Sequence, residues 1–510
     1  MNYRASLLAL AVLTAAAPAL AAEKASAKAE KSEKSENAVA APKVFTTEHT
    51  GRFNGQEVRY KAIAGETYLY DEDETPRAAI FSTSYIRQGV KDTADRPVIF
   101  IFNGGPGSAS LWLHMGAFGP KRLVLPSDAK DDGAAPYKII HNEQSPLDIA
   151  DMVFIDPVGT GFSRPVGKGE GKDYWGVDQD AESIAKFIRQ WTTQHKRWNS
   201  PKYLAGESYG TTRAAKLAEV LEGGFNGYGL NGIMLISAVL DFGTTRFQTG
   251  NEMPYIGFLP TYAATHWYHA KLGEKGVTVE QHVERARQFA VNEYAPALLK
   301  GNNLSDAEKA RVRKTLSELT GLSEQYLDQT NLRINAFRFM KQYGRDQGMT
   351  VGRFDSRYTG KDLDEAGETF DNDPSGYGIA PSYTAAFNHY IADELKVDLG
   401  AREFKTLSGE PGKNWDWAGK KRGGYVNVNV AEGLGQIMRE NKDLRVWLAS
   451  GYYDLATPFF AAETTLATNG LVKDRVSYTY YEAGHMMYLH HPSFDQLMRD
   501  IRNFVVAGRK

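Results

Sequence analysis

The pentapeptide Gly206-Glu207-Ser208-Tyr209-Gly210 decides how this chain of 510 residues is expected to fold. It follows the short apolar run Lys202-Tyr203-Leu204-Ala205 and precedes a helical stretch over residues 211–221. Glycines on both sides of a serine let a strand turn sharply into a helix, which lifts the serine hydroxyl clear of the sheet. The pattern predicts that Ser208 is a nucleophile. On the pentapeptide alone, a glycine-rich turn without chemistry remains the alternative.

Short apolar runs on both sides of this turn predict a mostly parallel sheet. Such runs are typical of strands that are buried on both faces, and they cover residues 97–102, 152–155, 202–205, 233–238, 444–450 and 476–481. Helical periodicity alternates with them, for example over residues 178–194. This order indicates an α/β fold, a central sheet flanked by helices, and the nucleophile turn specifies the α/β-hydrolase fold.

The core of this fold is predicted to come from two parts of the chain, residues 43–240 and residues 401–510. The first part opens with β-hairpins, in which residues 56–64 and 66–70 are expected to flank a turn at Gly65.

Between residues 241 and 400 the strand pattern lapses. Capping boxes at Thr278–Gln281 and Ser305–Glu308 open amphipathic helices, the second of which is expected to end near Gly321. We expect a mainly helical cap over the active site, with a second domain of unrelated function as the alternative.

The N-terminal residues are expected to lie outside the fold. A basic start, an apolar stretch and small residues at 19–21 are typical of a secretory signal peptide over residues 1–21. Residues 22–42, rich in Ala, Lys, Glu and Ser, predict a disordered tether. We therefore expect a protein of the periplasm or the medium, without membrane insertion after signal cleavage.

Composition excludes several classes of function. A net charge of −2 provides no positive electrostatic field that would attract nucleic acid or an anionic membrane. The absence of cysteine excludes thiolate metal sites and cysteine-protease chemistry. A large hydrophobic core must then stabilise an exported chain without disulfides.

A nucleophilic serine needs a histidine base and an acid that orients it, both at loops after later strands. Asp454 follows the strand that ends near Ser450, and His485 follows the last strand. The chain order Ser, Asp, His is the one expected of an α/β-hydrolase. Other histidines lie in or near helical stretches or behind a helix start, namely His114, His195, His266, His269, His282, His389, His490 and His491.

The developing oxyanion of such a reaction needs two backbone donors. The amide of Tyr209, directly after the serine, is one candidate. The loop Asn103-Gly104-Gly105-Pro106-Gly107 follows an early strand and is the second, because glycines let backbone N–H groups approach a substrate. A tight turn and nothing more is the alternative.

Together these segments resemble the serine carboxypeptidase family. The family signatures stand in family order at Asn103–Gly107, Asp156–Ser163, Gly206–Gly210, Ser450–Pro458 and Gly484–Met486. The resemblance implies that Ser208 is the nucleophile, His485 the general base and acid, and Asp454 the residue that holds the imidazole. It also implies an oxyanion hole from the amides of Gly105 and Tyr209, and no metal or organic cofactor.

The resemblance further implies that Asn103, Gly104 and Glu207 bind the C-terminal carboxylate of a substrate. The family uses a second glutamate two residues before a Gly-Pro; here that position, before Gly119-Pro120, is Ala117. The chain departs from the family pattern at two further positions: Ile101 stands where a tryptophan is usual, and Ser108 where a cysteine is usual.

Two adjacent carboxylates share a proton and so provide a neutral donor. Without its partner, Glu207 is expected to be ionised at neutral pH and to repel a free C-terminus. We therefore expect carboxylate binding to be weak, confined to low pH, or supplied by another residue, with His114 as one candidate.

The leading prediction is an exported serine-type carboxypeptidase that releases C-terminal residues from peptides through an acyl-enzyme. An esterase, amidase or acyltransferase with the same residues is the second hypothesis, favoured by Ala117. An inactive periplasmic binding protein is the third. Oligomeric state and side-chain preference cannot be predicted from this sequence.

Overall fold

The computed structural model describes residues 39–130, 133–225, 227–418 and 427–508. The predicted signal peptide and nearly all of the predicted tether lie outside these residues. Within the described part of the chain, no helix is long and apolar enough to cross a membrane.

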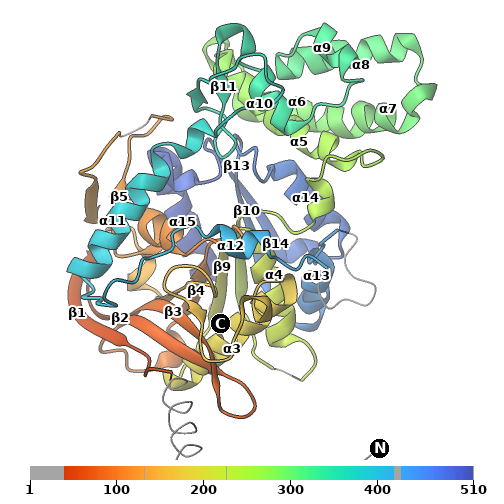
Figure 1. The fold of residues 1–510 in the computed structure, drawn as a ribbon. Helices are drawn as coiled ribbons and strands as arrows, with labels where there is room; N and C mark the ends of the chain where they lie inside the picture. The colour runs from red at the N-terminus through yellow and green to blue at the C-terminus, as the bar shows by residue number, and fades with distance from the viewer. Residues whose placement is uncertain (1–38, 131–132, 226, 419–426, 509–510) are drawn as a thin grey trace, which may run out of the picture.

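A ten-stranded sheet forms the centre of the molecule (Figure 1), in the order β1-β2-β3-β7-β4-β9-β10-β13-β14, with β8 paired to β3. Every neighbouring pair from β7 to β14 is parallel. These parallel strands are β7 (Asp151–Ile155), β4 (Val98–Phe102), β9 (Lys202–Ser208), β10 (Gly232–Ala238), β13 (Arg445–Gly451) and β14 (Val476–Tyr481). The predicted mostly parallel sheet and the α/β-hydrolase fold are confirmed.

Helices cover both faces of this sheet, and the alternation of side chains along β4 shows why. Val98 and Phe100 pack in one core cluster with α3 (Val177–Gln194), α4 (Tyr209–Glu222) and α13 (Ala431–Glu440). Ile99 and Ile101 pack in another cluster with α15 (His491–Ala507). Because successive side chains of a strand point to opposite faces, a continuous apolar run is typical of a strand that is covered on both faces.

Three antiparallel strands precede the parallel part of the sheet: β1 (Val44–Phe53), β2 (Gln56–Tyr70) and β3 (Pro76–Arg87). The predicted turn at Gly65 is wrong, because β2 continues through this residue. Gly65 pairs with Val44, and an added Cβ would lie 2.6 Å from the carbonyl oxygen of Lys43. Here glycine permits a close approach of two backbones rather than a turn.

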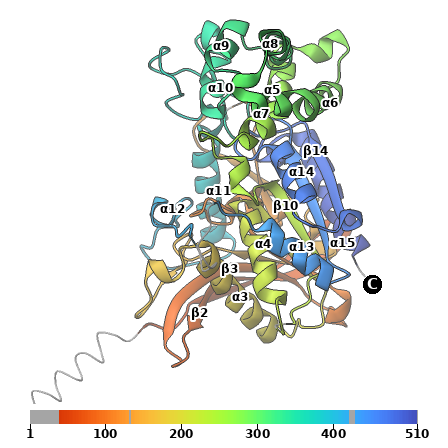
Figure 2. The same cartoon turned by 90° about the vertical axis from the view of Figure 1, so that its right-hand side faces the viewer.

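Residues 241–400 hold mainly helices. Both predicted capping boxes are formed, and the second helix ends at Gly321 in a left-handed conformation. The elements are α5 (Met253–His269), α6 (Val279–Phe289), α7 (Ala295–Lys300), α8 (Asp306–Thr320), α9 (Glu324–Gln329), α10 (Ala336–Gln342), β11 (Thr350–Val351), β12 (Thr359–Gly360) and α11 (Ile379–Asp393). Of these helices, α5 to α10 gather beyond one end of the sheet, while α11 runs beside the core (Figures 1 and 2).

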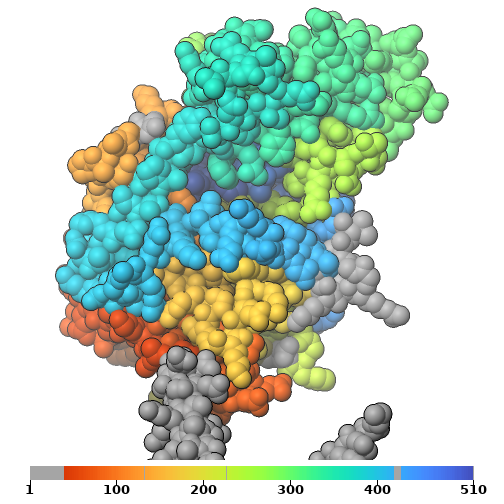
Figure 3. All heavy atoms as spheres, viewed as in Figure 1, coloured from red at the N-terminus to blue at the C-terminus, as the bar shows by residue number. Residues whose placement is uncertain are grey.

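Apart from single 3₁₀ and π-helical turns, several further elements complete the fold of the described residues. They are α2 (Leu111–Leu113) with a π-helical turn (His114–Phe118), the hairpin β5 (Lys121–Val124) and β6 (Lys138–His141), β8 (Arg164–Pro165), α12 (Gly409–Lys413) and α14 (Phe459–Thr468). The space-filling view shows a recess between the helices of the insertion and the segment around α12 (Figure 3).

Candidate active site

Ser208 lies at the junction of β9 and α4. Its backbone has φ 61° and ψ −130°, a conformation that residues other than glycine rarely adopt. Such strain persists only where the surroundings enforce it, and it is common at functional sites. The hydroxyl of Thr211 holds the turn by donating to the carbonyl oxygen of Ser208 at 2.7 Å.

Asp454 and His485 come together after β13 and β14, and both are buried. His485 Nδ1 donates to Asp454 Oδ2 at 2.7 Å, which leaves Nε2 as the acceptor. The carboxylate also accepts hydrogen bonds from the amides of Ala456 and Thr457 and from the Thr457 hydroxyl. Burial disfavours the imidazolium, but the charge and hydrogen bond of Asp454 outweigh it and raise the pKa of His485.

The glycine loop after β4 lies directly against the start of α4. A Cβ added at Gly104 would lie 2.4 Å from the amide nitrogen of Tyr209. Arg213 of α4 fixes this loop by donating to the carbonyl oxygen of Asn103. The two predicted oxyanion donors, the amides of Gly105 and Tyr209, therefore belong to segments in close contact.

Glu207 and Asn103 are also in contact. Asn103 Nδ2 donates to Glu207 Oε1 at 3.0 Å. The second oxygen, Glu207 Oε2, and the hydroxyl of Tyr488, which interacts with this carboxyl group, are both buried. Burial raises the pKa of Glu207 to about 7. Contrary to the expectation of an ionised Glu207 at neutral pH, burial therefore keeps part of this carboxyl group neutral near pH 7 without the second glutamate.

His114 does not take the place of the missing glutamate at Ala117. Its side chain lies outside the cavity described below, stacked on Phe154 at 3.9 Å between ring centroids and bonded to the hydroxyl of Tyr85. Burial lowers the pKa of His114 to about 3. Because the ring is neutral and enclosed by aromatic groups, it offers no charge to a substrate carboxylate.

A cavity of about 950 Å³ brings the predicted residues together. Ser208, His485, Asn103, Gly104, Gly105, Glu207 and Tyr209 all line it, and Asp454 lies behind His485. Among the described residues that line this cavity, His485 is the one histidine. Most other lining side chains are apolar, including Trp112, Phe247, Phe337 and Ile379.

Sequence reasoning missed the groups that hold the acid and base loops in place. The Thr457 hydroxyl contacts both Asp454 Oδ2 and His485 Nδ1, and its position three residues after Asp454 is the one local signal. Ser237 Oγ donates to the carbonyl oxygen of His485.

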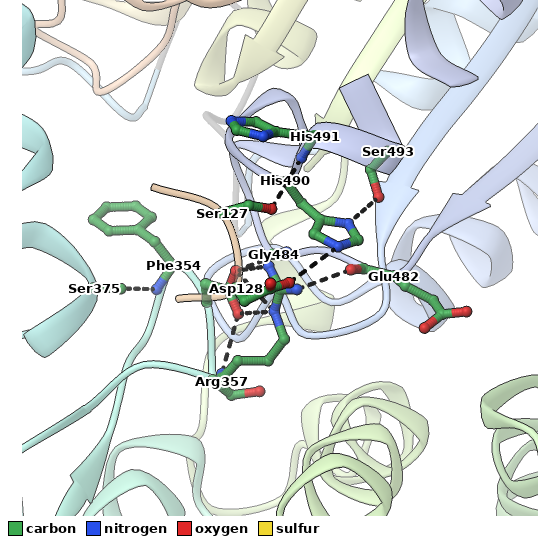
Figure 4. A network of polar contacts seen from close by, with 12 residues as sticks. Ser127, Asp128, Phe354, Arg357, Ser375, Glu482, Gly484, His490, His491 and Ser493 are labelled. Atoms are coloured by element: carbon green, nitrogen blue, oxygen red, sulfur yellow. Dashed lines mark hydrogen bonds and ion pairs between the residues drawn. The ribbon is translucent and has the colours of Figure 1, made fainter. Parts of the chain in front are cut away.

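The insertion contributes a third support. Asp355 accepts the amide of Gly484, and Arg357 donates to the carbonyl oxygen of Glu482 while paired with Asp355. Figure 4 shows Arg357 beside the loop that carries Gly484 and Glu482. No local pattern links these residues to His485, because more than 120 residues separate the two segments.

Known proteins resemble parts of this chain in sequence and most of it in fold. The model of the family "Serine carboxypeptidase" matches residues 68–490. A serine carboxypeptidase-like protein of Arabidopsis thaliana is 29% identical over 176 residues, which cover 34% of each chain. The pheromone-processing carboxypeptidase KEX1 of Saccharomyces cerevisiae is 32% identical over 146 residues, 27% of this chain and 19% of that one. The matches thus span about a third or less of these relatives.

Among solved structures, that of the prohormone-processing carboxypeptidase KEX1 from Saccharomyces cerevisiae has a TM-score of 0.52 and 16% identity, covering 87% of this chain and 91% of that one. At this identity the likeness shows the fold alone. The family model, however, covers most of the chain, including the segments of Ser208, Asp454 and His485. The chain belongs to the serine carboxypeptidase family.

Proposed function

We propose that this protein is a serine carboxypeptidase that releases C-terminal residues from peptides through an acyl-enzyme. The observation that carries the proposal is the hydrogen-bonded pair of His485 and Asp454. His485 lines the same cavity as Ser208, whose backbone is strained. The match to the family supports peptides as the substrate.

In the proposed reaction, His485 Nε2 takes the proton of the Ser208 hydroxyl as Oγ attacks the scissile carbonyl carbon. The C–N bond then breaks, and His485 returns the proton to the leaving amine. Water attacks the resulting ester by the same route and frees Ser208. Asp454 keeps the imidazole in the correct tautomer and stabilises the transient imidazolium. The amides of Gly105 and Tyr209 stabilise the oxyanion.

Asn103, Gly104 and Glu207 are proposed to form one side of the site for the C-terminal carboxylate. A neutral carboxyl can donate a hydrogen bond to a carboxylate, whereas an ionised one repels it. Because burial raises the pKa of Glu207 to about 7, binding of a free C-terminus through this residue is strongest below neutral pH.

We also propose that the protein is exported to the periplasm or the medium, with residues 241–400 as a cap over the site. The basic and apolar N-terminal sequence supports export. The lining of the cavity by Phe247, Phe337 and Ile379 supports the cap.

Mass spectrometry of peptides of known sequence after digestion tests this function. A ladder of products that lack one, two or more C-terminal residues is expected, and Ser208→Ala should abolish it. Internal cleavage, or no cleavage by a protein that hydrolyses simple esters, would contradict the assignment.

The second candidate is an esterase, amidase or acyltransferase that uses the same residues. Ala117 favours it, since the family's second carboxylate-binding glutamate is absent. Comparison of kcat/KM for a peptide with a free C-terminus and for its ester and amide forms separates the two functions.

A further inference from the structure

The cavity contains a cation that the proposed reaction does not use. Among the described residues that line it, Arg353 is the one lysine or arginine, and Glu207 is the one acid. A substrate carboxylate placed beside Glu207 alone would meet a group that is partly ionised near neutral pH. Because the family's second glutamate is absent at position 117, the negative charge of the substrate carboxylate has no partner among the described residues of the cavity other than Arg353.

Arg353 is held between the loops of the acid and the base. Its carbonyl oxygen accepts the amide of Leu455, directly after Asp454, at 3.0 Å. The next carbonyl oxygen, that of Phe354, accepts the amide of His485 at 2.6 Å. Figure 4 shows Phe354 anchored further by its amide, which donates to Ser375. The backbone at Arg353 and Phe354 is thus fixed to both loops, and Arg353 lines the cavity that also holds Ser208 and His485.

The guanidinium of Arg353 is available to a ligand. It makes no hydrogen bond or ion pair with another described residue, although its backbone amide binds Asp373. It lies over the ring of Phe354, 5.4 Å from the centroid, and that ring lies 5.2 Å from the imidazole of His485. A planar guanidinium presents parallel N–H donors that match both oxygens of a carboxylate.

We propose that Arg353 binds a carboxylate carried by the leaving-group residue of the substrate, and so replaces the family's second glutamate as an anchor. Arg353 is assigned to the leaving-group side of the scissile bond because its guanidinium lies near the ring of Phe354, which also lies near His485, the residue that returns the proton to the leaving amine. The carboxylate is either the free C-terminus or an acidic side chain of the last residue. This inference rests on the proposed peptidase function.

Binding to the Ser208→Ala protein tests the inference without any need for turnover. Calorimetry would compare three blocked dipeptides that end in leucine free acid, leucine amide and glutamate amide. With Arg353 present, at least one acidic peptide should bind about 10- to 100-fold more tightly than the leucine amide, the range expected for a charge-assisted hydrogen bond. Tight binding of the dipeptide that ends in leucine free acid would identify the C-terminus as the carboxylate that Arg353 binds. Tight binding of the dipeptide that ends in glutamate amide would identify the acidic side chain instead.

Adding Arg353→Gln should remove this preference. Arg353→Lys should retain part of it, because lysine keeps the positive charge but lacks the two parallel N–H donors of the guanidinium. Arg313→Gln, at an arginine of α8 that pairs with Glu324, is the matched control and should change nothing. No preference with Arg353 present, or a preference that survives Arg353→Gln, would overturn the inference.

Kinetics separate carboxylate binding from a structural role through Phe354. In the active protein, Arg353→Gln should lower kcat/KM about 10-fold or more for a peptide with the acidic group that the binding comparison identifies, and change hydrolysis of an ethyl ester without that group less than about 3-fold. Equal losses for both substrates would show that Arg353 only positions His485. Absence of peptide hydrolysis by the unmodified protein would contradict the proposed function, while the binding comparison would still decide the role of Arg353.

Discussion

Replacement of Glu207 by glutamine should stabilise the protein at neutral and alkaline pH. Glutamine has nearly the same shape and keeps an oxygen that can accept from Asn103, as Glu207 does at 3.0 Å. It lacks the ionisable group whose charge is disfavoured by burial. The change therefore removes an electrostatic penalty and leaves packing unaltered.

The magnitude follows from the pKa of Glu207, which is raised from 4.5 to about 7. Its folded-state pKa lies above its unfolded value, so its contribution to stability is complete below pH 4.5 and is lost as pH rises to about 7. The shift corresponds to about 3 kcal/mol. Relative to the unmodified protein, Glu207→Gln should be equally stable at pH 4 and about 3 kcal/mol more stable at pH 8.

Urea unfolding in a Ser208→Ala background, which prevents self-digestion, would measure this difference at pH 4, 6 and 8. Glu72→Gln, at an exposed glutamate, is the matched control. A difference that is the same at pH 4 and pH 8, or a variant that is less stable at pH 8, would refute the argument from burial.

Further predictions concern catalysis, measured as hydrolysis of a chromogenic ester. Asp454→Asn should lower kcat about 10,000-fold, because His485 loses the partner that fixes its tautomer; an unchanged kcat would contradict its role. Gly104→Ala should lower kcat at least about 100-fold, since the new Cβ would displace the Tyr209 amide; a variant that folds and keeps full activity would count against the oxyanion hole. Thr457→Val should lower kcat/KM about 10-fold, whereas Thr457→Ser should retain it, because the hydroxyl donates to Asp454. The kcat/KM of the unmodified protein should rise with pH through a midpoint above 6.5, since His485 must be neutral to act and its pKa is raised; a midpoint below 6.5 would exclude this.

The buried parallel strands and the residues at their ends could be predicted because their signals are local. Ser208, Asp454 and His485 each follow an apolar run, and parallel strands bring such ends to one edge of the sheet. Gly65 misled the prediction because a glycine that allows a close backbone approach and a glycine in a turn look alike in sequence.

The groups that tune the site could not be predicted, because they depend on burial and on contacts between distant segments. The neutral state of His114 and the raised pKa of Glu207 both result from enclosure by residues far away in the chain. Arg353 and Phe354 lie in the insertion, and only the fold shows that their backbone binds the loops of Asp454 and His485.

The most direct test of the account is the intact mass of the folded protein after reaction with a fluorophosphonate probe. We predict one adduct per molecule, located on Ser208, and none after Ser208→Ala. A folded protein that takes up no probe would instead be an inactive binding protein, and an adduct on another residue would contradict the assignment of the nucleophile.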